Sequence, residues 1–129
     1  MRDLVFAMEL RGQAAPVEGR EGVLKAHTSG RRPAGETVQF ASEVVLRGET
    51  FDETGSIEYV GRGKVQFVTV GGGYLSPSPL PDTQWGAVIW RITAADGEFQ
   101  GASGFITSNF TVSASGEVVD NHYVRMALP

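Results

Sequence analysis

The sequence predicts an all-β fold: a single antiparallel β-barrel that closes with roughly eight strands and spans residues 1–129. Seventeen glycines and six prolines separate short runs rich in Val, Phe, Thr and Ile, which is the pattern of strands between turns. No window carries the 3.6-residue apolar repeat of an amphipathic helix. A closed barrel would also leave no sheet edge free to pair with other chains. A flattened β-sandwich is the alternative.

Composition limits the classes of function. The length of 129 residues fits one domain, and a domain of this size builds a core without disulfide or metal. Cysteine is absent, which excludes thiol catalysis and fits a cytoplasmic location. The net charge of -4 argues against a nucleic-acid partner. No apolar run reaches the roughly 18 residues of a membrane span, and residues 1–10 do not resemble a signal peptide, so we expect no membrane partner.

Alternating apolar and polar residues define the expected strands. In the first of them, Leu4, Phe6 and Met8 share one face, as the two-residue period of a strand requires. The expected strands cover residues 4–11, 23–28, 37–47, 57–60, 65–70, 85–93, 105–112 and 118–128. Short turns join them, and no connection is long enough for a crossover helix.

Two connections bear on function. Residues 48–55 form a polar connection in which Glu49, Asp52 and Glu53 indicate an acidic surface turn, because their spacing lacks the pattern of a calcium loop. Residues 71–81 begin with three glycines and end in a proline-rich run. This segment is either a lid over the barrel mouth or an inert surface loop. Residues 12–22 are also expected to form a loop.

The most informative stretch lies between Asp96 and Val112. It begins with an Asp-Gly turn and continues with Gly101 and Gly104, which predict a sharp bend just before a strand at residues 105–112. The run Gly-x-Phe-x-Gly-Ala-x-Gly, followed by a threonine-containing strand, resembles the late strands of allene oxide cyclase/dirigent-like barrels. It is also similar to runs in calycin-like barrels. The resemblance implies a small closed barrel, with a trimer as one possible assembly.

Asp120 and His122 are the candidate catalytic residues. Two positions apart in a strand, they project from the same face, beside apolar neighbours. An imidazole titrates near neutral pH, so His122 is expected to act as acid or base and Asp120 to orient it. The alternative is a histidine near the barrel rim that is bonded to its neighbour and has no further role.

Aromatic side chains supply the candidate ligand-binding residues, since rings with polar tips suit a mainly apolar ligand. These candidates are Tyr59, Tyr74, Trp90, Phe110 and Tyr123. For Trp90 a place in the core is the competing interpretation. We predict no metal site, because His27 and His122 lie far apart in the sequence and show no ligand spacing.

Three functions remain open. The first is a cofactor-independent cyclase or isomerase acting on a small, mainly apolar substrate, the kind of activity that the allene oxide cyclase resemblance implies. The second is a non-catalytic carrier with the same pocket. The third is an interaction protein whose barrel is filled by its own side chains. We also expect a homo-oligomer, a dimer or trimer, because Trp85, Ala87 and Ile89 form an apolar row on one face of their strand.

Overall fold

Nine strands and one turn of 3₁₀ helix make up the chain in a computed structural model, which describes all residues 1–129. In chain order the elements are β1 (Arg2–Pro16), β2 (Val23–Arg31), β3 (Thr37–Arg47), β4 (Thr50–Tyr59), β5 (Gly63–Thr69), β6 (Gly73–Pro77), β7 (Thr83–Ala95), η1 (Gly97–Phe99), β8 (Ser103–Ser113) and β9 (Glu117–Leu128). No helix is long and apolar enough to cross a membrane.

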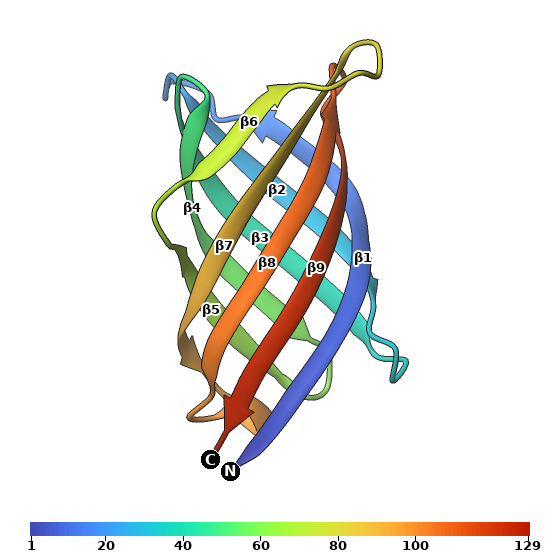
Figure 1. The fold of residues 1–129 in the computed structure, drawn as a ribbon, viewed down its shortest axis with the longest axis vertical. Helices are drawn as coiled ribbons and strands as arrows, with labels where there is room; N and C mark the ends of the chain where they lie inside the picture. Colours follow the sequence, from blue (N-terminus) through green and yellow to red (C-terminus); the bar gives the residue numbers. More distant parts are fainter.

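The strands form one sheet that closes on itself (Figure 1). Its order is β3-β2-β1-β9-β8-β7-β5-β4-β6, and an additional pairing of β3 with β4 completes the ring. Every neighbouring pair is antiparallel. The expected all-β barrel with eight strands in its wall is therefore confirmed, and β6 is an additional short strand.

β6 lies beyond the end of β5, between β4 and β7. It pairs with β4 at Thr50 and Phe51 and with β7 over residues 84–87, whereas β5 pairs with the opposite ends of the same two strands. Residues 71–81, expected to be a lid or a loop, thus contribute a piece of wall. Successive side chains of a strand point to opposite faces. Leu75 accordingly lines the interior, while Tyr74 is exposed.

Two expected connections are strands instead. β1 continues through Pro16, because its second half pairs with β2 from Leu10 onward. β4 begins at Thr50 and includes most of the expected acidic surface turn. Phe51, Glu53 and Ile57 all point inward from β4. The buried carboxyl group of Glu53 interrupts the apolar alternation, and for that reason the sequence pattern hides this part of the strand.

The bend before β8 agrees with its sequence. η1 precedes it, and Gly101 and Gly104 have φ angles of 80° and 141°, in the region that side chains resist. At Gly104 an added Cβ would lie 2.1 Å from the backbone oxygen of Arg125 on the neighbouring strand. Gly104 therefore permits a close approach of β8 and β9 as well as the bend.

Aromatic rings fill the middle of the barrel. Phe67 and Trp90 have ring centroids 4.4 Å apart, and Phe40 packs on both rings at 5.6 and 5.4 Å. Trp90 is 1 % exposed. It packs as a core residue, as the alternative interpretation of the sequence predicted.

The end of the barrel that carries both chain termini (Figure 1) is closed by a second group of side chains. Phe6, Tyr59 and Phe99 pack edge-on or tilted against one another. The guanidinium of Arg32 lies 5.1 Å from the centre of the Phe6 ring and forms an ion pair with Glu36. Any access to the interior must therefore come from the opposite end.

Candidate functional site

A cavity of about 170 Å³ lies inside the barrel, toward the end opposite the termini. Eleven of its sixteen lining residues are hydrophobic, so most of its wall suits an apolar ligand. Leu24, Leu46, Leu75, Phe51 and Phe110 provide much of this wall, and they come from five different strands. The barrel is therefore not filled by its own side chains at this end.

Glu53 is the first polar group at the cavity. β4 directs its side chain inward, where it is 6 % exposed. The Ser42 hydroxyl on β3 donates a hydrogen bond of 2.6 Å to Oε2 of Glu53. No lysine or arginine side chain pairs with this carboxyl group. Burial without a cation makes ionisation costly.

Asp120 is the second polar group. It lies on β9 and is 4 % exposed, and it lines the same cavity. The Ser108 hydroxyl donates a 2.5 Å hydrogen bond to Oδ1, and His122 Nε2 lies 2.9 Å from Oδ2. The His122 imidazole therefore contacts the Asp120 carboxyl group through Nε2. Three polar side chains of β8 and β9 thus form one connected group.

The two carboxyl groups influence each other. Burial raises the pKa of Glu53 from its ordinary value of 4.5 to about 8, and the hydrogen bond from Ser42 opposes this rise. The nearby charge of Asp120 raises the pKa further. The indole N–H of Trp90 lowers it slightly, although its geometry falls short of a full hydrogen bond. At neutral pH the cavity therefore holds a protonated Glu53.

Thr28 is a third polar group at the cavity, where Ser108 and Gln84 also contribute to the wall. Its side chain is 4 % exposed and lines the cavity from β2. Its hydroxyl oxygen has no hydrogen-bond partner within the protein. A buried hydroxyl normally finds a partner, and one left without a protein partner inside a cavity is available to a ligand.

The structure places the predicted catalytic pair inside the barrel but changes the arrangement of its members. Asp120 lines the cavity, whereas His122 lies behind it, edge-on to Phe40 and Trp90 with centroids 5.5 and 5.2 Å away. Of the two, only Asp120 lines the cavity, and His122 contacts it from behind through Nε2. His122 Nδ1 has no partner in the protein.

The predicted ligand-binding aromatics do not form one site. Phe110 lines the cavity, and Trp90 lies in the aromatic core beside Glu53. Tyr59 is buried at the closed end, where burial raises the pKa of its hydroxyl group and Arg32 partly opposes the rise. Tyr74 and Tyr123 are 68 % and 53 % exposed on the outer surface, so both are wrong as lining residues of the interior.

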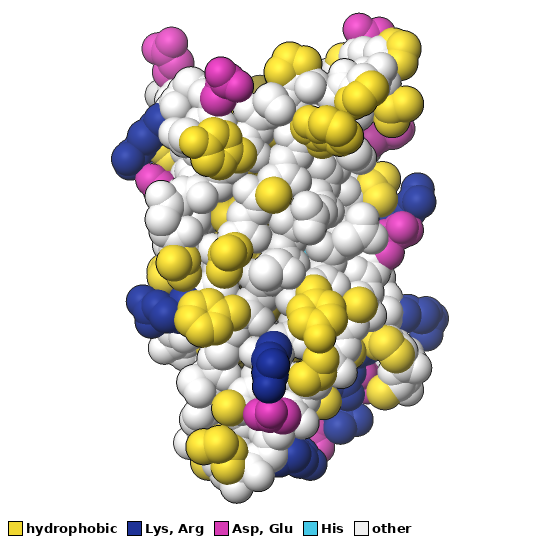
Figure 2. All heavy atoms as spheres, viewed as in Figure 1, with side chains coloured by type: hydrophobic (Ala, Val, Ile, Leu, Met, Phe, Trp, Pro, Cys, Tyr) yellow, Lys and Arg dark blue, Asp and Glu magenta, His cyan; other side chains and the backbone are white.

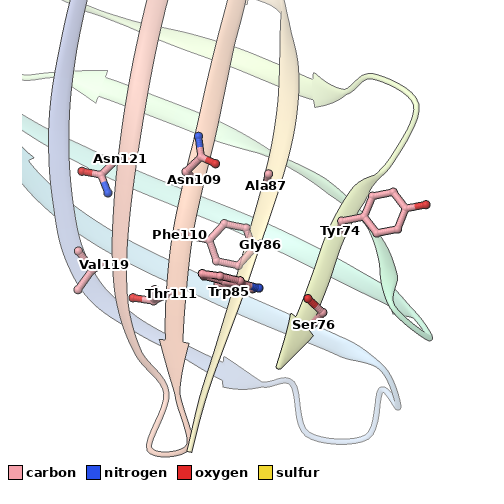
Figure 3. Close-up of a pocket in the computed structure, with 10 residues that line it drawn as sticks. All are labelled: Tyr74, Ser76, Trp85, Gly86, Ala87, Asn109, Phe110, Thr111, Val119 and Asn121. Atoms are coloured by element: carbon pink, nitrogen blue, oxygen red, sulfur yellow. The ribbon is translucent and has the colours of Figure 1, made fainter. Parts of the chain in front are cut away.

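Tyr74 instead lines a shallow hollow on the outer surface of β6 to β9 (Figure 3). Trp85 lies between Tyr74 and the amide side chains of Asn109 and Asn121, and the Phe110 ring lies behind Gly86. The surrounding face carries several further exposed hydrophobic side chains (Figure 2). Those that belong to β1, β7, β8 and β9 are Val5, Trp85, Ile89, Phe105 and Tyr123.

Sequence reasoning missed three polar residues of the cavity: Glu53, Ser108 and Thr28. Each lies in a strand with period-two alternation, and that periodicity is the one signal that could have placed them inside. The structure brings no three His, Cys, Asp or Glu side chains together in a way that could hold a metal ion. His27 lies on the outer face of β2.

Comparison with known proteins leaves the chain without an assigned relative. No family model, no curated protein and no solved structure matches it. The closed eight-stranded antiparallel barrel is compatible with a calycin-like fold. The resemblance to allene oxide cyclase has no support from these comparisons.

Proposed function

We propose that this protein binds a small, mainly apolar molecule inside the barrel. The observation that carries the proposal is the cavity: an apolar chamber of about 170 Å³ with buried polar groups on its wall. Cavities of about 150 Å³ with apolar walls accommodate a single benzene ring. The volume therefore suits a one-ring ligand, and Glu53, Asp120 and Thr28 would fix its orientation through a few polar contacts.

A matched pair of substitutions tests this proposal. Ala26 points into the cavity from β2, whereas Ala41 lies on the outer face of β3, between the inward-facing Phe40 and Ser42. Ala26→Leu should fill part of the cavity and weaken the binding of phenethyl alcohol in a calorimetric titration. Ala41→Leu should leave the binding unchanged. Equal affinities in the two variants would argue against the interior site.

Acid–base catalysis is a second candidate function, and the position of two carboxyl groups, a protonated Glu53 and Asp120, at one cavity favours it. Protonated Glu53 would give a proton to one atom of a bound substrate while Asp120 takes a proton from another. The substrate would keep all its atoms, as an isomerisation requires. Proton transfer from Asp120 back to Glu53 would then restore the starting state.

Deuterium exchange tests the catalytic candidate without knowledge of the natural substrate. Phenylacetone has exchangeable hydrogens beside its carbonyl group, and its exchange in D₂O can be followed by NMR. The protein should accelerate the exchange, and Asp120→Asn should abolish the acceleration. An exchange rate equal to that of buffer, together with tight binding of phenethyl alcohol, would support the carrier instead.

We also propose that copies of the chain associate through the outer face of β7 to β9. Trp85 and Ile89 are 49 % and 47 % exposed there, and Phe105 and Tyr123 extend the patch across β8 and β9. A patch of this kind in a soluble protein is typically an interaction surface. A symmetric dimer would cover it most simply.

A further inference from the structure

The part of the cavity wall around Glu53 and Asp120 lacks a positive charge of its own. These two are the only titratable side chains among the lining residues, and they come from β4 and β9. His122 lies behind Asp120 and outside the lining. The one buried arginine, Arg32, is at the closed end and forms an ion pair with Glu36.

The carboxyl groups of Glu53 and Asp120 supply four acceptor oxygens to this region, and no cationic donor faces them. The hydroxyl groups of Ser42 and Ser108 already donate to the two carboxyl groups. Thr28 faces the cavity from β2 with an oxygen that no protein group contacts. A ligand with N–H donors and a positive charge would therefore suit the two carboxyl groups, because it would offset the negative charge buried there.

We propose that the ligand is a protonated primary amine on an apolar one-ring body, with its ammonium group between Glu53, Asp120 and Thr28. An ammonium has three donors and no acceptor, which matches the acceptors that these three side chains present. The ring would occupy the apolar part of the cavity near Phe51 and Phe110. This inference rests on the proposed binding function and specifies its ligand class.

Proton release accompanies such binding. In the free protein Glu53 is protonated at neutral pH because its pKa is about 8. A neighbouring ammonium favours the ionised carboxylate and lowers this pKa, so complex formation below pH 8 expels a proton. Affinity for the amine should accordingly rise as the pH increases from about 6.5 to about 8.5, where phenethylamine itself stays protonated.

Three probes of nearly equal shape test the ligand class: phenethylamine, phenethyl alcohol and phenylacetate. Calorimetric titration of the wild-type protein should show that the amine binds about tenfold to a hundredfold more tightly than the alcohol, as expected for hydrogen bonds to a charged group. Phenylacetate should bind most weakly. Titrations of the amine near pH 7 in two buffers of different ionisation enthalpy should reveal the released proton.

Isosteric variants connect the preference to the named residues. Asp120→Asn and Glu53→Gln should each weaken binding of the amine at least tenfold more than binding of the alcohol, and Glu53→Gln should abolish the proton release. Thr28→Val should reduce the affinity for the amine more than the affinity for the alcohol. Alcohol binding equal to or tighter than amine binding would overturn this inference and leave the binding function standing. A wild-type protein that binds none of the three probes would overturn both.

Discussion

Glu53 on β4 and Asp120 on β9 face the same cavity from strands four positions apart around an eight-stranded wall. Each carboxyl group receives a hydrogen bond from a serine on an adjacent strand, Ser42 on β3 and Ser108 on β8. No lysine or arginine neutralises the pair. Stability alone would favour apolar side chains at these positions, which is why we proposed this part of the cavity as the binding site.

Glu53 should make the stability of the protein depend on pH. Its pKa is about 8 in the folded protein and near 4.5 in the unfolded chain, so the folded state binds more protons between these values. Stability should therefore fall as the pH rises from about 4.5 to about 8. Glu53→Gln should remove this fall and stabilise the protein by roughly 3 kcal/mol at pH 7. Urea unfolding of both proteins at several pH values measures the difference, and parallel pH profiles would contradict it.

Gly104 should tolerate substitution less well than Gly101. A Cβ at Gly104 would meet the backbone of β9 at 2.1 Å, whereas at Gly101 the nearest atom belongs to the ring of Pro129 at the chain terminus, 2.8 Å away. We expect Gly104→Val to destabilise the fold by about 3 kcal/mol and Gly101→Val by about 1 kcal/mol. Denaturation midpoints with an unchanged m-value provide the comparison. Equal midpoints for the two variants would show that the close approach to β9 does not make Gly104 less tolerant of a side chain.

Arg32 should contribute to stability and not to ligand binding. It lies at the closed end, where it contacts the rings of Phe6 and Tyr59 and pairs with Glu36. Arg32→Met should cost on the order of 2 kcal/mol, because Glu36 would retain only its longer contact with Arg62, at 3.5 Å. The affinity for phenethyl alcohol should not change. A large loss of affinity in a folded variant would mean that the two ends of the barrel are coupled.

Association through the outer face should be sensitive to one substitution. Ile89 lies in the middle of β7 with its side chain half exposed, next to Thr107 and across β8 from Tyr123. Ile89→Asp would place a charge within the proposed contact and should yield monomers, as measured by light scattering. A monomeric wild-type protein would exclude the association. An oligomer that survives Ile89→Asp would require a different face.

The sequence predicts the barrel more fully than it predicts the site. Period-two alternation is clear in β9, where it places Asp120 and His122 on one face, and the structure confirms that both side chains share a face. Alternation alone did not say which face lines the interior. The alternation is weak in β4, because Glu53 takes an inward position where an apolar residue is expected. The meeting of Glu53 with Asp120 depends on how the strands close around the barrel, and neither residue carries a local signal of the other.

The roles within the predicted pair could not be read from the sequence for a related reason. Alternation places Asp120 and His122 on one face. It does not show which of the two side chains lines the cavity, and in the structure only Asp120 does. Phe40 and Trp90, from distant parts of the chain, occupy the space beside His122. They fill the core next to the imidazole and leave Asp120 as the member of the pair that lines the cavity.

A crystal structure of the protein soaked with phenethylamine at about pH 8.5 tests the central claim most directly, since Glu53 is then ionised in a substantial fraction of molecules. If the ligand binds inside the barrel, density should lie in the cavity, with the ring near Phe51 and Phe110. The nitrogen should then lie within hydrogen-bond distance of Glu53 and Asp120. Density confined to the outer hollow beside Trp85, with the cavity free of ligand, would contradict it.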